Sequence, residues 1–540
     1  MLRFKYKCIK TKYNDAFMNE GEFNPLWTEP VKTTHQARYP LGLNILNQRM
    51  SESLLPGITT ITPRARYYSF YAWSLWDIQR GRDEVDQATG LYQRDRDYAL
   101  ACSLHEKIKR DHDTITGGGP ARKQLSKFEG ENKISTNFRH LQARRGGYDA
   151  YSSPISSLKI LNAQYDPPKL TKIGKRLAES FEERVEETDY PKYVGKDKIP
   201  TEVLKQYAKR CCLCNLPSSA KERDILIRLL LDKSSPLRRG SLLGLLTLIR
   251  EIDIDPRKLP TAFLDATYFQ CCNSENGYVS INFPKNLEKV TSYWRVYRVD
   301  EYIGFAFRAL FSAILRELDD KVLTPISEVK SRLSQSEIMD RFFSYDLELS
   351  RANFAALLKS LEKRKINLYG SADKEKPPIE KQIFRNLVDE NPGSLSEVFA
   401  DVLLMLAVVC HKNGDRWNAD EWLWYRSTRH IKSGEEPNVY SIFRRLPPAE
   451  KDFTSFHEFL IKYILDRHEW RRINLTSGRE MWVEIHDGRC KRIREYEPKM
   501  PSLRLNNASQ ILEDLGLYRG EGNVATLTDI GRKVLEGDVP

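Results

Sequence analysis

The sequence lacks any apolar run long enough to cross a membrane. Its longest apolar runs, residues 241–249 and 398–410, are shorter than the roughly 20 residues that a membrane-spanning helix requires, and the second contains Asp401. Residues 1–13, MLRFKYKCIKTKY, carry charges but precede no apolar segment, so they do not resemble a secretory signal. The sequence therefore predicts a cytoplasmic protein without a membrane partner.

Cysteine is scarce, with nine in 540 residues, so the chain has no dense disulfide framework and suits a reducing compartment. Cys211, Cys212 and Cys214 lie close together, and Cys271–Cys272 and Cys410–His411 are further sources of metal ligands. A zinc site usually shows two Cys-x-x-Cys turns, whereas the first group ends an amphipathic helix. Buried cysteines are the favoured interpretation, and neither a metal nor another cofactor is predicted.

No complete catalytic motif is present. TGGGPARKQ contains three glycines and Lys123 but not the spacing of a nucleotide-binding P-loop, and no strand precedes it. Asp320, Glu328 and Lys330 follow the order of a metal-dependent nuclease, but such enzymes place Glu-x-Lys on a strand and this segment has a helical pattern. An enzyme is therefore not favoured, and no catalytic residue is assigned.

Positive charge is abundant and unevenly distributed. The formal net charge is +12, which permits a polyanionic partner without requiring one. Between Pro120 and Gly147 the acidic residues are Glu129 and Glu131, against seven basic ones: Arg122, Lys123, Lys127, Lys133, Arg139, Arg144 and Arg145. Attraction to phosphates requires clustered lysine and arginine, so this stretch predicts nucleic-acid contact, mainly with DNA. The expected phosphate contacts are Arg122, Lys123, Arg139, Arg144 and Arg145.

Helical periodicity dominates the chain, and strand signals are short. Apolar positions at i, i+3 and i+4 predict helices over ten segments. The segments are 63–80, 94–112, 202–214, 221–233, 237–252, 300–320, 327–344, 351–365, 395–412 and 455–468. The clearest strands are a hairpin within 470–494, with HDG at its turn. The predicted fold class is mainly α with small β-hairpins (α+β).

Polar segments rich in turn formers, such as 114–124, predict five domains. They are a helical domain at 1–113, a winged-helix-like module with the basic stretch at 114–188, helical domains at 189–370 and 371–469, and a hairpin plus a second winged-helix-like module at 470–540.

The two modules are predicted from an internal repeat. LTKIGKRL at 170–177 and LTDIGRKV at 527–534 share leucine, threonine, isoleucine and glycine in register. An apolar cluster precedes each copy by about ten residues, which predicts a helix, a short hairpin and a helix capped by Thr171 or Thr528. This order resembles a winged helix. In the second copy we expect a helix over about 505–515, with Arg504 at its start. Either DNA or another protein would contact this helix.

Residues 54–73, LLPGITTITPRARYYSFYAW, place Arg64 and Arg66 in the first turn of an expected helix, after Thr62 as its cap. Cations are disfavoured at a helix N-terminus, so a compensating negative charge is expected. Threonine hydroxyls, backbone N–H groups and the two guanidinium groups form a plausible phosphate cradle. The alternative is pairing with carboxylates, such as those at 19–23 or 83–86. The aromatic side chains of this segment are expected in the core.

The same segment carries a family resemblance. Its pattern PG-x-T-x-x-T-x-R-x-RYY-x-F is similar to the N-terminal signature of uncharacterised bacterial families described as domains of unknown function. RCCLCNLPSSAKERDILIRLL and the LT-x-x-G endings resemble the same kind of protein. The resemblance covers roughly the first 240 residues best. Such families often lie among anti-phage defence genes, including Druantia-like multigene systems. The resemblance implies a place among defence genes. It assigns no catalytic residue to this chain.

Two functions remain open. The first is a defence-system component that binds nucleic acid through phosphate contacts, together with other defence proteins. The second is a non-enzymatic helical scaffold or adaptor that binds partner proteins. Convergence of the basic residues at 120–147 and 504–519 on one face would favour the first. Scattered charge with a large exposed apolar patch would favour the second.

Overall fold

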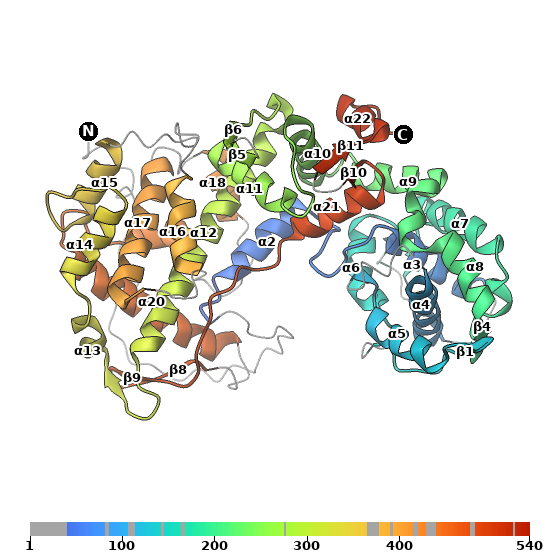
Figure 1. Ribbon diagram of the computed structural model, residues 1–540, viewed down its shortest axis with the longest axis horizontal. Helices are drawn as coiled ribbons and strands as arrows, with labels where there is room; N and C mark the ends of the chain where they lie inside the picture. Colours follow the sequence, from blue (N-terminus) through green and yellow to red (C-terminus); the bar gives the residue numbers. More distant parts are fainter. Residues whose placement is uncertain are drawn as a thin grey trace.

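The computed structural model describes residues 40–81, 86–105, 114–141, 145–162, 164, 168–274, 277–363, 377–388, 393–413, 419–427, 439–475, 481–521 and 524–540. It is mainly helical with small antiparallel sheets, as the sequence predicts. Two helical lobes lie on either side of a central group of elements (Figure 1). None of the helices in these described ranges is long and apolar enough to cross a membrane.

The first lobe, on the right in Figure 1, surrounds an aromatic helix. Its helices are α3 (Arg66–Gln79), α4 (Gln87–Leu104), α5 (Gly118–Lys127), α6 (Tyr148–Ser157), α7 (Lys172–Glu186), α8 (Thr201–Cys211) and α9 (Ala220–Leu230), with 3-10 turns η3 (Tyr190–Lys192) and η4 (Leu213–Ser218). Its strands are β1 (Lys133–Ser135), β2 (Leu161–Asn162), β3 (Lys169–Leu170) and β4 (Lys198–Pro200). Tyr67, Tyr68, Phe70, Tyr71 and Trp73 of α3 are buried, so their prediction as core is confirmed, whereas Trp76 is half-buried. Helix α3 packs against α4, α6 and α7.

The central group joins segments from both ends of the chain (Figure 1). It contains α2 (Asn44–Leu54), α10 (Pro236–Glu251), α11 (Leu259–Phe269), β5 (Cys271–Ser274), β6 (Gly277–Ser280), α21 (Arg504–Asp514), β10 (Tyr518–Glu521), β11 (Val524–Leu527) and α22 (Asp529–Glu536). Helix α10 packs against α2, α11, α21 and α22. The apolar run at 241–249 is therefore a buried helix, as expected.

The second lobe is built around the long helix α12 (Glu288–Glu317), which packs against α17, α11 and α2. Its other helices are α13 (Ile326–Ser331), α14 (Gln335–Ser344), α15 (Phe354–Lys363), α16 (Ile379–Val388), α17 (Leu395–Asn413), α18 (Asp420–Ser427), α19 (Val439–Arg445) and α20 (Phe453–Leu475), with the 3-10 turn η5 (Lys285–Leu287). Strands β7 (Thr324–Pro325), β8 (Val483–His486) and β9 (Arg489–Arg492) form one sheet in the order β7-β9-β8.

Several predicted boundaries need correction. Residues 118–124, expected as part of the linker at 114–124, belong to α5, because Gly117 adopts φ +69° and turns the chain into the helix. The helix expected at 327–344 is two helices, since Ser334 caps a new helix at Gln335. The hairpin within 470–494 is confirmed as β8 and β9, with Asp487 and Gly488 at positive φ in its turn.

The predicted repeat is present as a helix, a hairpin and a helix at both positions. The first copy is α6, β2, β3 and α7, and the second is α21, β10, β11 and α22. Thr171 caps α7 by accepting from the Gly174 N–H at 3.1 Å, and Thr528 caps α22 by accepting from the Gly531 N–H at 3.2 Å. The threonine hydroxyls also donate to equivalent carbonyl groups, those of Lys159 and Gly516, at 2.7 and 2.6 Å. The description of these units as winged helices stays a prediction.

Candidate functional site

Arg64 is buried in an ion pair within the protein. Its Nη2 lies 2.9 Å from Oδ1 of Asp514, and its Nε donates to both oxygens of that carboxylate. Nη1 donates to the hydroxyl of Thr114 at 3.0 Å. The Asp514 carboxylate also accepts the Ala65 N–H at 2.9 Å, so a residue at the end of α21 stabilises the N-terminus of α3.

Arg66 is fully buried in a second ion pair. Its Nη2 lies 2.9 Å from Oε2 of Glu222, with neither side chain exposed to solvent. Nη1 donates to the backbone carbonyl groups of Cys212 and Arg210 at 2.7 and 3.2 Å, and the guanidinium lies over the ring of Phe181. Both arginines therefore match the alternative of internal ion pairs, with carboxylates other than those expected.

The expected helix cap at Thr62 is wrong. Helix α3 begins at Arg66 after Ala65, which provides no side-chain cap, and Thr62 instead accepts the Thr59 N–H at 3.0 Å. Of the carboxylates suggested for the arginines, Asp86 caps α4 by accepting from the Ala88 N–H. Residues 19–23, Asp83 and Glu84 lie outside the described residues. The negative charges that compensate this helix start come from the protein itself.

Arg504 also lies in an internal contact. Its side chain is 8% exposed, and it donates to the Ile58 carbonyl at 2.7 Å and to Glu52 at 2.6 Å. Asn507 donates to the Thr59 carbonyl at 2.7 Å. The polar side of α21 thus contacts the segment that precedes α3. Because α21 lies in the central group and α5 at the end of the first lobe, Arg504 and the basic stretch do not form one surface (Figure 1).

Of the remaining predicted residues, Arg122 and Lys123 lie on α5. Lys123 and Arg139 are exposed, and Arg122 is half-buried. Arg145 is half-buried; its Nε lies 2.7 Å from Oδ1 of Asp149, and its guanidinium is over the ring of Tyr148. Arg144 lies outside the described residues.

The strand pair β1–β4 adds lysines that the sequence did not connect to this stretch. Ile134 and Ile199 are paired across the two strands and are buried on one face. Lys133 and Lys198 precede them in their strands, so both side chains lie on the opposite, exposed face. The Gln124 side chain of α5 donates to the Ser135 carbonyl at 2.8 Å, which holds the helix beside the strands.

We define the basic surface as a set of exposed cations on and around α5, β1 and β4. Its members are Lys123, Lys127, Lys133, Arg139, Lys196 and Lys198. Lys123 and Lys127 are one helical turn apart on the same side of α5. Within the part of the chain that the structure describes, no carboxylate forms an ion pair with any of the six, although Glu129, Glu131 and Asp197 are exposed nearby in the sequence. This surface can attract an extended polyanion.

Sequence reasoning missed Lys196 and Lys198 because strand pairing joins segments about 65 residues apart. Two hydrogen bonds of Thr136 connect the segment after β1 to the segment before β4. Its N–H donates to the Asp197 carbonyl, and its hydroxyl donates to the Lys196 carbonyl. The short alternation KDKI at 196–199 was the available signal, but four residues do not identify a strand partner.

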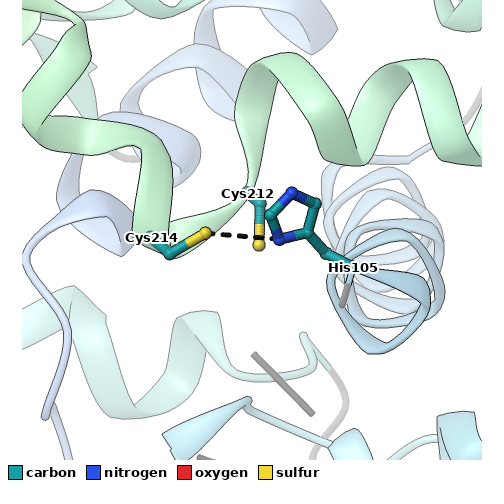
Figure 2. A group of neighbouring side chains, drawn as sticks. All are labelled: His105, Cys212 and Cys214. Atoms are coloured by element: carbon teal, nitrogen blue, oxygen red, sulfur yellow. Dashed lines mark hydrogen bonds between the residues drawn. The ribbon is translucent and has the colours of Figure 1, made fainter. Parts of the chain in front are cut away.

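A different kind of site lies at the C-terminal end of α4. His105, Cys212 and Cys214 come together there, with the His105 ring facing the two sulfur atoms (Figure 2). Cys211, Cys271 and Cys272 are buried, as predicted for the cysteines in general, and Cys410 is half-buried. His105 was missed because it is 107 residues before Cys212, in a segment without other ligand types at metal-binding spacing.

A cavity of about 550 Å³ lies between the central group and α16 of the second lobe, lined by residues including Asp265, Cys272 and Lys381. Asp265 is buried, and its two oxygens pair with Lys381 at 2.7 Å and Arg298 at 3.1 Å. Burial raises the pKa of the Cys272 thiol to about 12, so this thiol stays protonated at neutral pH. These groups are already satisfied and provide no activated nucleophile.

No known protein family, curated protein or solved structure matches this chain.

Proposed function

We propose that this protein binds nucleic acid through phosphate contacts made by the basic surface, without strong sequence preference. The observation that supports the proposal is the set of six exposed cations on and around α5, β1 and β4 that have no carboxylate partner among the described residues. The buried arginines differ, because Arg64, Arg66 and Arg504 are each held by a carboxylate of the chain. The surface cations are thus the ones available to a ligand.

The chemistry of the surface favours a phosphate backbone over a compact anion. Duplex DNA carries one charge per about 1.7 Å of its axis, so it can contact several separated lysines at once. Lysine is a strongly hydrated point charge, which suits phosphate attraction better than base recognition. Arg122 and Arg139 would contribute phosphate contacts at the same face, and DNA is the expected nucleic acid.

We further propose that binding takes place in a multi-protein complex of bacterial anti-phage defence. This part rests on the resemblance of residues 54–76 and of the LT-x-x-G segments to families found among such genes. Defence-protein partners follow from the same resemblance, and a cytoplasmic location is proposed from the small number of cysteines.

A salt titration tests the nucleic-acid proposal. Each duplex phosphate contact contributes about −0.9 to the slope of log affinity against log salt, so affinity should fall steeply between about 50 and 200 mM salt. Replacing Lys123, Lys127, Lys133 and Lys198 together by glutamine should weaken binding and make the slope less steep by up to about 3 to 4. Fluorescence anisotropy with a labelled duplex and a labelled single strand measures both quantities.

The matched control removes four exposed lysines of the second half of the chain, Lys285, Lys289, Lys321 and Lys359. The control variant loses the same number of positive charges as the test variant but none from the basic surface. Its slope of log affinity against log salt should therefore stay at the wild-type value. Absence of binding at low salt, an affinity that does not respond to salt, or equal losses in both variants would contradict the proposal.

The scaffold function remains the alternative, and one observation favours it. The polar side of α21, expected to contact DNA in a winged helix, instead contacts the chain before α3 through Arg504 and Asn507. A second module used for protein contacts suits an adaptor. Copurification of neighbouring gene products with and without nuclease distinguishes the two, because partners held by nucleic acid are lost after digestion and partners held by protein contacts are not.

A further inference from the structure

Three ligand-type side chains meet where α4 ends and the α8–η4 connection begins. The ligand atoms of His105, Cys212 and Cys214 all lie within 4.8 Å of one another. Nδ1 of His105 is 3.3 Å from Sγ of Cys214, and Figure 2 shows both sulfur atoms turned toward the imidazole. Cys212 is fully buried, while His105 and Cys214 are half-buried.

These separations fit a metal ion at the centre of the group. Zinc binds cysteine sulfur at about 2.3 Å and histidine nitrogen at about 2.0 to 2.1 Å in a tetrahedron, so its ligand atoms lie about 3.6 to 3.8 Å apart. The measured 3.3 Å and the 4.8 Å limit bracket that range, so small side-chain rotations would complete the geometry. Soft sulfur donors with an imidazole select zinc over magnesium or calcium.

A fourth sulfur lies next to this group but outside the set of ligand atoms that are within 4.8 Å of one another. Cys102 occupies the last turn of α4, three residues before His105, and is fully buried. The Cys212 thiol donates to the sulfur of Cys102 and accepts from the thiol and the backbone N–H of Cys214. Backbone N–H contacts to cysteine sulfur orient a metal ligand. The segments therefore provide three sulfurs and one imidazole nitrogen.

We propose that His105, Cys212 and Cys214 bind one Zn²⁺ ion, with Cys102 as its fourth ligand. The ion links the C-terminal end of α4 to the connection between α8 and α9, and so cross-links two segments of the first lobe. Four protein ligands in a mostly buried place make this a structural site, because a catalytic zinc keeps one position for water.

The chain around the cysteines is held by contacts that do not involve the ligand atoms. Arg66 donates to the Cys212 carbonyl at 2.7 Å, and the Tyr98 hydroxyl donates to the Cys211 carbonyl at 2.8 Å. Asn215 donates to the Lys209 carbonyl at 2.8 Å. These bonds fix the turn that carries Cys212 and Cys214, which makes Arg66 a positioning residue for the zinc site.

Metal content and cobalt spectroscopy test the site in the full chain. Protein purified under reducing conditions with zinc in the growth medium should contain about one zinc ion per chain by elemental analysis. Replacement of zinc by Co²⁺ should give strong visible bands of a tetrahedral ion and a near-ultraviolet sulfur-to-cobalt band. X-ray absorption should show Zn–S distances of about 2.3 Å with one shorter nitrogen distance.

Single substitutions assign the ligands. Cys212→Ser, Cys214→Ser and His105→Ala should each lower zinc affinity by at least about tenfold in competition with a chromophoric chelator. Cys272→Ser, at a buried cysteine in another part of the molecule, is the matched control and should retain the ion. A Cys102→Ser variant should lose sulfur-to-cobalt intensity, and an unchanged spectrum would overturn the assignment of Cys102.

The positioning role of Arg66 has its own control. Arg66→Lys should weaken zinc affinity about 10- to 100-fold, because lysine keeps the charge but cannot reach Glu222 and the Cys212 carbonyl together. Arg64→Lys alters a similar buried ion pair that does not contact the cysteine turn, and should leave zinc affinity unchanged.

Two results would overturn the zinc site regardless of how the variants fold. One is a wild-type chain that is reduced, folded and exposed to zinc yet contains no stoichiometric metal and gives no tetrahedral cobalt spectrum. The other is a stoichiometric metal that remains bound with unchanged spectra after the Cys212 and Cys214 substitutions.

Discussion

Arg64 and Arg66 are two residues apart, and each is paired with a carboxylate from a distant part of the chain. Asp514 is 450 residues from Arg64, and Glu222 is 156 residues from Arg66. Neither charge can be exposed to water in the folded protein. Removing one partner leaves the other buried and unpaired, which costs far more than the loss of a surface ion pair.

We therefore expect Arg66→Ala to lower the free energy of unfolding by about 3 to 5 kcal/mol, with a similar loss for Arg64→Ala. Urea unfolding followed by circular dichroism measures the change. Lysine at either position should give an intermediate loss, because it retains the charge without the planar fork. A melting temperature that stays at the wild-type value in both alanine variants would show that these ion pairs do not stabilise the fold.

The free energy of unfolding should depend on pH because of the buried carboxyl group of Asp97. Burial raises the pKa of Asp97 to about 7, although Arg96 and a hydrogen bond from Tyr190 act in the opposite direction. The unfolded chain has an aspartate pKa near 3.9, so between about pH 4 and 7 the folded state binds a proton that the unfolded state lacks. The contribution of Asp97 to stability therefore falls as pH rises through this window.

The Asp97→Asn variant should remove that part of the pH dependence. Asparagine keeps an oxygen that can accept the Tyr190 hydroxyl, which lies 3.0 Å from Asp97. The melting temperature of the wild type should fall relative to the variant between about pH 4 and 7, with the two closest at the acid end. Parallel curves across this range would contradict the assignment of a raised pKa to Asp97.

At the residue scale, the sequence predicts which groups need a partner but not which partner they find. The two cations at the start of α3 required a compensating charge, and that requirement was correct. Asp514 and Glu222 were not predictable, because tertiary packing brings them to α3 and no local pattern marks them. For the same reason His105 was not connected to Cys212 and Cys214.

Among the elements, the two helix–hairpin–helix units share a close backbone contact. A Cβ atom at Gly174 would lie 2.1 Å from the Ile160 carbonyl oxygen, and one at Gly531 would lie 2.0 Å from that of Leu517. Both contacts are to backbone, which cannot rotate away. The shared glycine of the LT-x-I-G motif thus lets the second helix of each unit lie directly against the chain that leaves the first.

Gly174→Ala and Gly531→Ala should each destabilise the protein by about 1 to 3 kcal/mol, because the added methyl group forces the hairpin and helix apart. Gly119→Ala is the control, since a Cβ atom added at this position of α5 would meet nothing within 4 Å. Alanine there should be neutral or stabilise by up to about 1 kcal/mol. Thermal unfolding of the three variants measures these changes in stability. Equal stability in all three would contradict the close contact.

The elements that sequence analysis predicted best are those with a long, regular pattern. The apolar periodicity of α10 and α17 and the repeated LT-x-I-G motif each mark a structure within one segment. Helix α5 was missed because Gly118, Gly119 and Pro120 suggested a turn, although proline is well tolerated in a first helical turn. The pairing of β1 with β4 was missed because two three-residue strands carry too little pattern.

On the scale of the whole molecule, the C-terminal unit holds the first lobe to the central group. Helix α21 reaches the first lobe through Asp514 and reaches the segment before α3 through Arg504 and Asn507. It also packs against α10, α11 and η4. The N-terminal half is therefore not complete without the last residues of the chain.

Deletion of residues 501–540 should loosen the start of α3. Hydrogen exchange in residues 57–70 should become faster, because Ala65 loses its carboxylate acceptor and Arg64 loses its ion pair. A shorter deletion, residues 529–540, removes α22 but keeps Asp514, so exchange in 57–70 should stay close to that of the full chain. Equal protection in the full chain and the longer deletion would contradict this dependence.

The pairing of Arg64 with Asp514 also has a consequence for the order in which the protein is made. The two residues are 450 positions apart, and ribosomes add about 5 to 20 residues per second, so Arg64 waits roughly 20 to 90 s for its partner. The nascent chain thus carries an unfinished first lobe through most of its translation. Slow codons late in the reading frame would lengthen that interval, and chaperones that bind nascent chains would have their longest opportunity at residues 57–79.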